Sequence, residues 1–127
     1  MYKNSTIASA LGVLAVILGA FGAHALKAKL SPEAMQSFET AVRYQFIHVL
    51  ILLFVNSYKE FDLKQKSAIS RFLIGGILMF SGSIYAIYLL NVPAKTIWFI
   101  TPLGGVLLIV AWVLMTFQFV KKVIKKE

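Results

Sequence analysis

The sequence of 127 residues contains no cysteine and little charge: five residues are acidic, and charged residues make up 14% of the chain. The absence of cysteine excludes disulfides, thiolate nucleophiles and zinc–thiolate sites. The chain also has no nucleophile paired with a base in a known motif, no paired acids deep in an apolar segment and no glycine loop before a soluble helix. Enzyme chemistry is therefore weakly supported, and we expect no catalytic residue, no cofactor and no metal site.

Apolar residues are what the chain has in excess. They make up 59% of the sequence, and the mean hydropathy is +0.80. Four long apolar segments are separated by charged hinges, and a soluble chain this short could not bury all of them, whereas a bilayer can. We therefore predict an all-α, integral membrane four-helix bundle that forms a single domain over residues 1–127. The expected transmembrane helices cover roughly residues 5–26, 40–58, 68–90 and 101–120.

The first apolar run also has some features of a secretory signal peptide. Met1–Lys3 precedes it, and the small residues around His24 imitate a cleavage site. The run is longer than the usual signal-peptide core, so we expect it to stay in place as a membrane helix.

Proline and short polar side chains mark the ends of the other helices. Ser31, Pro32 and Glu33 suit a cap, a first helical position and the positive end of the helix dipole. The second helix is therefore expected to begin near Pro32, with a short interfacial part before it enters the membrane. Residues 91–93 should end the third helix. The fourth is predicted to start with Thr101 as cap and Pro102 at the first position; a start near Lys95 with a kink at the proline is the alternative.

The basic residues are distributed unevenly between the two sides of the membrane. Nine lysines and arginines fall on the side of the two termini and four on the other side, so the positive-inside rule places both termini in the cytoplasm. The net charge of +8 lies at membrane edges, which favours lipid over nucleic acid as the partner. The tail lysines determine topology and are expected to contact anionic lipids: Lys121, Lys122, Lys125 and Lys126.

Small residues recur on single faces of the predicted helices. On the first helix, Ala8, Gly12, Ala15, Gly19 and Ala23 form one stripe, which allows close approach of a neighbouring helix in lipid. The stripe is interpreted as packing within the chain, with a homodimer interface as the alternative. Further glycines are assigned to helix packing rather than to phosphate binding: Gly22, Gly75, Gly82, Gly104 and Gly105.

A polar cluster is predicted between the first and second helices. Glu39 and Arg43 are four residues apart on one helical face, with the acid first, and an arginine away from water needs a partner. His24 is expected at a similar depth. Deeper in the membrane, Gln45 and His48 share a face.

Tyr44 precedes His48 by one turn and could hydrogen-bond it, and polar residues of the third helix could reach across: Ser81, Ser83 and Tyr85. We interpret the cluster as a polar clamp that joins helices one, two and three. The alternative is a ligand site or a proton relay at Glu39, Arg43 and His48. A metal site at His24, Glu39 and His48 lacks any typical ligand spacing.

Several sequence blocks resemble a family of small four-helix membrane proteins known as domain of unknown function 423 or uncharacterised protein family 0382. The resemblance covers nearly the whole chain and rests on residues 18–26, 41–48, 80–85 and 101–105. One departure is Ala111 before Trp112, where the family pattern has glycine. The resemblance implies a bacterial plasma-membrane protein, with related proteins in eukaryotic organelle membranes. It implies no activity, substrate or cofactor.

Three functions are compatible with these observations. The first is a small membrane protein with a structural, interaction or membrane-stability role, acting on an unidentified membrane-protein partner or as a homo-oligomer. The second is a small oligomeric transporter or channel that uses the polar cluster; the position of Glu39 at the membrane edge disfavours proton-coupled export. An enzyme acting on lipid is the third.

Overall fold

The computed structural model describes residues 2–126, with side chains up to residue 125, and it is helical throughout. The elements are α1 Lys3–Ile17, η1 Leu18–Gly22, α2 Ala23–Leu26, α3 Pro32–Ser57, α4 Leu63–Leu89, α5 Ala94–Ile97 and α6 Ile100–Lys126. The first three run on from one another with right-handed helical backbone angles at their junctions. Within the described residues, four helices are long and apolar enough to cross a membrane: 3–26, 32–57, 63–89 and 94–125.

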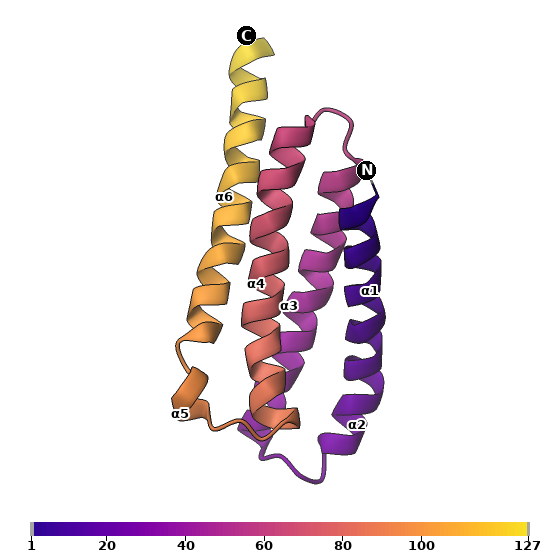
Figure 1. The fold of residues 1–127 in the computed structure, drawn as a ribbon, viewed down its shortest axis with the longest axis vertical. Coiled ribbons are helices and arrows are strands. Elements are labelled where there is room, and N and C mark those ends of the chain that lie inside the picture. Colours follow the sequence, from indigo (N-terminus) through magenta and orange to yellow (C-terminus); the bar gives the residue numbers. More distant parts are fainter. Residues whose placement is uncertain (1, 127) are drawn as a thin grey trace.

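The four long helices are antiparallel, and both ends of the chain lie at the same end of the molecule (Figure 1). Helices α3 and α4 pack against each other at the centre, α1 packs on α3, and α6 packs on α4. Within the described residues α1 and α6 do not pack on each other, so the bundle is open between its two outer helices. Lipid can cover apolar side chains left exposed in this way, because hydrocarbon tails are as apolar as leucine.

The starts of α3 and α4 are fixed by side-chain caps. The Ser31 hydroxyl accepts a hydrogen bond from the Ala34 amide at 3.1 Å, and Pro32 occupies the first helical position. The predicted helix start at Pro32 is therefore confirmed. Asp62 forms a reciprocal capping box with Gln65, so α4 begins within the charged hinge and ahead of its apolar run. In that hinge the Tyr58 hydroxyl donates to the Glu60 carboxylate at 2.6 Å, which raises the pKa of Tyr58.

The connection between α4 and α6 differs from the prediction at one end. Asn91 adopts a left-handed conformation with φ of 57°, and α4 ends just before it, as expected. The prediction of Thr101 as helix cap is wrong. The short helix α5 is followed by a turn at residues 98–99, and α6 begins at Ile100. Pro102 then lies in the first turn, where the missing N–H costs no bond within the helix, and Thr101 instead hydrogen-bonds Ser83 of α4.

Glycine brings α4 and α6 unusually close. A Cβ placed on Gly104 would lie 2.8 Å from the Phe80 Cα atom and closer still to its backbone nitrogen. On the facing helix, a Cβ on Gly76 would lie 2.5 Å from Leu108 Cδ2 and 3.1 Å from the Gly104 carbonyl oxygen. The two backbones therefore touch at Gly76 and Gly104.

The other predicted packing glycines differ in how closely they are approached. Toward α3, a Cβ on Gly19 or Gly22 would lie 3.1 Å or 3.2 Å from the nearest side-chain atom. Gly12, Gly75 and Gly105 have only ordinary contacts, at 3.6, 3.4 and 3.7 Å. The prediction of Gly82 as a helix-packing residue is wrong, because no atom lies within 4 Å of the position that a Cβ would take there. It faces a groove between α1 and α4 and contributes no helix contact.

Candidate functional site

The polar site at the centre of the molecule is built on Gln45, which is 2% exposed. Its amide nitrogen donates to the Leu11 carbonyl of α1 at 2.7 Å. Its amide oxygen accepts a hydrogen bond from the Tyr85 hydroxyl of α4 at 2.6 Å. One turn earlier on α3, the Ala41 carbonyl accepts from Ser81 of α4 at 2.7 Å. Gln45 thus connects three helices through one side chain, because an amide carries both a donor and an acceptor.

His48 lies one turn further along α3 and uses both ring nitrogens. Nδ1 lies 2.7 Å from the Tyr44 carbonyl, which can only accept, so Nδ1 carries the proton. Nε2 then accepts from the indole N–H of Trp112 on α6 at 3.0 Å. A protonated ring would direct a second N–H at the Trp112 donor, so this geometry requires a neutral imidazole. The bond also links α3 to α6, which otherwise packs on α4.

Tyr44 contributes its backbone to this site rather than its hydroxyl. Its ring stacks on Phe80 of α4, with 4.8 Å between the centroids. A cavity of about 450 Å³ opens between α3 and α6 at this level, and Tyr44, Ile47, His48 and Trp112 help to line it. Most of the remaining lining is apolar: Phe80, Gly105, Leu108 and Ile109.

The predicted six-residue cluster is split by the structure into two groups. Gln45 and His48 are buried, whereas His24, Glu39 and Arg43 are exposed. Gln45 follows Arg43 by two positions, which is about 200° around a helix, so the α3 members of the two groups lie on opposite faces of that helix. His24 belongs to α2. Within residues 2–125 no ion pair joins Glu39 to Arg43, so the expected pairing is not formed. Both residues line a cavity of about 190 Å³ beside η1 and α2.

A second polar network, which the sequence did not indicate as a site, lies nearer the chain termini. Asn56 of α3 accepts from the Asn4 amide of α1 at 3.2 Å and donates to the Ser70 hydroxyl of α4 at 2.8 Å. Asn56 continues the face of Gln45 and His48 along α3, which was its only sequence signal. Asn4 and Ser70 carried no comparable signal in the sequence, because short polar residues near the starts of predicted helices are common.

These networks leave no buried polar side-chain atom without a partner in the part of the chain that the structure describes. In the same part, no three histidine, aspartate or glutamate side chains come together. Trp112 is the member of the central site that sequence reasoning missed. It lies in an apolar run among large hydrophobic residues, and only the packing of α6 shows that it meets His48.

The family is settled by comparison with known proteins. A family described as "Protein of unknown function (DUF423)" matches residues 18–105, which include Gln45, His48 and Tyr85. The chain belongs to this family. The UPF0382 membrane protein of Staphylococcus aureus strain bovine RF122 is 36% identical over 110 residues, covering 84% of this chain and 88% of that protein.

Relatives occur in other bacteria as well. The UPF0382 membrane protein YwdK of Bacillus subtilis is 36% identical and covers 86% of this chain and 89% of its own length. A UPF0382 membrane protein of Haemophilus influenzae is also 36% identical and covers 91% of each chain. No solved structure matches the chain. The resemblance noted from the sequence is thus confirmed, as is its implication of a multi-pass membrane protein from a family of unknown function.

The bond between His48 and Trp112 predicts a measurable coupling. We expect His48→Phe and Trp112→Phe each to lower the unfolding free energy in detergent by about 1 kcal/mol. The double variant should lose less than the sum of the two, because either substitution alone already breaks the bond. Trp98→Phe is the matched control, since Trp98 is exposed and faces no histidine. If the stability losses of the two single variants, measured by thermal unfolding, add up to the loss in the double variant, the bond does not form in solution.

Proposed function

We propose that this protein acts as a structural or interaction component of the bacterial plasma membrane rather than as a transporter or an enzyme. The observation that carries the proposal is the use of the buried polar groups. Gln45 bonds to α1 and α4, and His48 bonds to the Tyr44 carbonyl of its own helix and to Trp112 of α6. Each polar heteroatom of these two side chains is hydrogen-bonded within the chain, which stabilises the fold and leaves little capacity for binding a passing solute.

The outer helices support the same proposal. The continuous helix α1–η1 and helix α6 carry large apolar side chains that are more than 40% exposed, which suits contact with lipid or with a partner helix: Val13, Val16, Phe21, Val106, Ile109, Val113 and Phe117. On their inner sides, α1 packs on α3 and α6 packs on α4 through small residues, and α1 also accepts the hydrogen bond from Gln45. Packed inner faces and exposed apolar outer faces fit a role in the assembly or stability of a membrane complex, or the formation of a homo-oligomer.

We further propose that both termini lie in the cytoplasm, with α3 beginning in the outer interface. Four spans bring the termini to one end (Figure 1), and nine of the 13 lysines and arginines are at that end. Contact of the tail lysines with anionic lipid fits this orientation. The side chain of Lys126 lies outside the part that the structure describes.

The lack of cysteine makes this proposal directly testable by single-cysteine labelling in whole cells. Lys29→Cys, in the loop between α2 and α3, should react with a membrane-impermeant maleimide added outside. Lys64→Cys, near the start of α4, should react only after the cells are opened. Reaction of Lys64→Cys from outside would overturn the orientation.

The same labelling separates an interaction protein from a transporter. Ile47→Cys and Ile109→Cys line the cavity beside His48, and we expect neither to react with the water-soluble reagent from either side. Lys29→Cys is the positive control. Reaction at either cavity position would reveal a water-filled path and would overturn the proposed role.

Transport by an oligomer is the second candidate, because a cavity of about 450 Å³ reaches His48 from the side of α6. It predicts solute flux in proteoliposomes that is lost in His48→Ala and in Glu39→Gln. The apolar lining and the engaged ring nitrogens favour the first proposal.

A further inference from the structure

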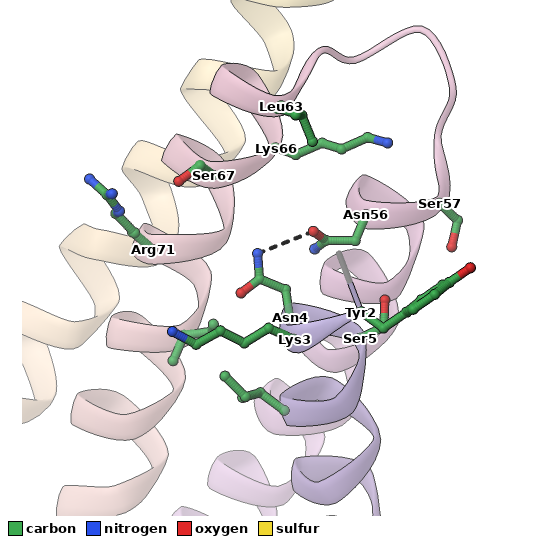
Figure 2. A pocket seen from close by; sticks show the side chains of 12 residues that line it. Tyr2, Lys3, Asn4, Ser5, Asn56, Ser57, Leu63, Lys66, Ser67 and Arg71 are labelled. Carbon is green, nitrogen blue, oxygen red and sulfur yellow. Dashed lines mark hydrogen bonds between the residues drawn. The ribbon is translucent and has the colours of Figure 1, made fainter.

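A polar cavity lies at the end that holds the chain termini, between the starts of α1 and α4 (Figure 2). It has a volume of about 820 Å³. Three cations line it, Lys3 from α1 and Lys66 and Arg71 from α4. The other polar lining residues are neutral: Tyr2, Asn4, Ser5, Asn56, Ser57 and Ser67. No aspartate or glutamate is among the lining residues, so the cavity carries uncompensated positive charge.

The cations of this cavity are available for a ligand. Figure 2 shows Lys3 extending from α1 toward α4, and Lys66 extending from α4 toward the side of Ser57. Within residues 2–125 none of the three cations is bonded to a carboxylate. The Asn4–Asn56 hydrogen bond between them holds α1 against α3 at this level. In Figure 2 the Arg71 side chain extends to the side of α4 opposite Lys66, so the three long side chains must turn toward one another to share a ligand. A phosphate suits such a set of cations, because it accepts several charge-assisted hydrogen bonds.

A groove lined mostly by apolar side chains lies between α1 and α4, further toward the middle of the molecule than this cavity. Helices α1 and α4 both rest on α3, and a second cavity of about 100 Å³ lies between them. On the α1 side the lining side chains recur at helical spacing from one cavity to the next, at Ile7, Leu11, Leu14 and Leu18. On the α4 side they are Ile74, Ile77, Leu78 and Gly82. Ser81 and Tyr85 of α4 and Gln45 of α3 also line the smaller cavity. Gly82 leaves the groove open, since nothing lies within 4 Å of where its side chain would begin.

We propose that this groove binds one anionic phospholipid, with the headgroup phosphate among Lys3, Lys66 and Arg71 and an acyl chain along the apolar wall. The groove runs along the helices, as a lipid tail does in a bilayer, and its charged end is the membrane-edge end. A second copy of the chain in the same orientation would bring further cations to that end rather than neutralise these. The site is separate from the lysine tail of α6, whose residues do not line either cavity.

The test is lipid binding to the purified full-length protein, followed by native mass spectrometry. Dioleoyl phosphatidylglycerol should bind at least tenfold more tightly than dioleoyl phosphatidylcholine. The variant Lys66→Gln/Arg71→Gln should lose this preference, with a fall in phosphatidylglycerol affinity of roughly thirtyfold for two cations near the phosphate. Lys121→Gln/Lys122→Gln is the control with the same charge change outside the groove and should keep the preference. Lys3→Gln, in the exposed first turn of α1, gives an independent reading if the double variant does not fold.

A further variant separates a lipid from a free phosphate ion. Gly82→Leu fills the apolar groove without touching the basic cavity, so it should weaken phosphatidylglycerol binding at least fivefold. Glycerol 3-phosphate, which has no acyl chain, should bind weakly and equally to this variant and to the unchanged protein. Strong binding of glycerol 3-phosphate would identify a soluble phosphate site instead of a lipid site. Equal affinity for both lipids, or a change from dimer to monomer in Gly82→Leu, would overturn the proposal, the latter by showing that a second copy fills the groove.

Discussion

Replacing Gly104 with alanine should lower the melting temperature of the purified protein by roughly 5–15 °C. The new methyl group would enter the backbone of α4 at Phe80, 2.8 Å from its Cα atom. Backbone cannot turn aside as a side chain can, so α4 and α6 would have to separate. Overpacking of this kind costs typically 1–3 kcal/mol, and in a domain of this size each kcal/mol is worth several degrees. Thermal unfolding followed by size-exclusion chromatography in detergent would measure the loss.

Two neighbouring glycines provide matched controls. A Cβ on Gly105 meets only the Phe80 ring at 3.7 Å, and one on Gly82 meets nothing. Alanine is the better helix former by about 1 kcal/mol. Gly105→Ala and Gly82→Ala should therefore leave the melting temperature unchanged or raise it. A Gly104→Ala protein as stable as these controls would mean that α4 and α6 do not meet at this glycine.

The second large effect is expected at Gln45. Gln45→Leu removes the bond to the Leu11 carbonyl and leaves the half-buried Tyr85 hydroxyl without its acceptor on α3. Cross-helix hydrogen bonds in membranes are worth about 0.6 to 1.7 kcal/mol each, and a hydroxyl that loses its acceptor adds to the cost. We expect a total loss of about 2–3 kcal/mol, measured as the unfolding free energy in a mixed-detergent titration.

The Tyr85 hydroxyl allows the two contributions to be separated. Tyr85→Phe should cost about 1 kcal/mol, and adding it to Gln45→Leu should restore part of the loss because no hydroxyl then remains unpaired. Tyr88→Phe, one turn away from Tyr85, should be nearly neutral. If the double variant is less stable than Gln45→Leu alone, the two side chains do not depend on each other, and the polar clamp at Gln45 is not what joins α1, α3 and α4.

How much of this site the sequence could predict depends on the helix face concerned. Gln45 and His48 were recognisable because they share one apolar face of a membrane helix, where polar groups need partners. Glu39 and Arg43 were misjudged for the opposite reason. Their spacing allows an ion pair, but at an exposed position water and headgroups compete for both charges, so the spacing alone does not produce one.

The contacts between helices could not be predicted from the sequence. Trp112 follows His48 by 64 positions, and no periodicity connects residues on two apolar helices. The same applies to the glycines of the third helix: Gly76 lies against Gly104, whereas Gly82 faces open space. A small residue permits close approach, but which small residues meet is set by how the helices cross.

The sequence by itself determined the class of protein. Four apolar stretches of membrane length, with charged hinges between them, specify four spans, because the backbone polar groups of each stretch can be satisfied only within a helix. The local signals at Ser31 and Asn91 also fixed where helices begin and end, since caps act over a few residues. Only the tertiary structure decided that the bundle is open, that His48 meets Trp112 and that a basic cavity forms between α1 and α4. The physical reason is that lipid makes apolar faces nearly equivalent, so shape and a few hydrogen bonds choose which helices pack together.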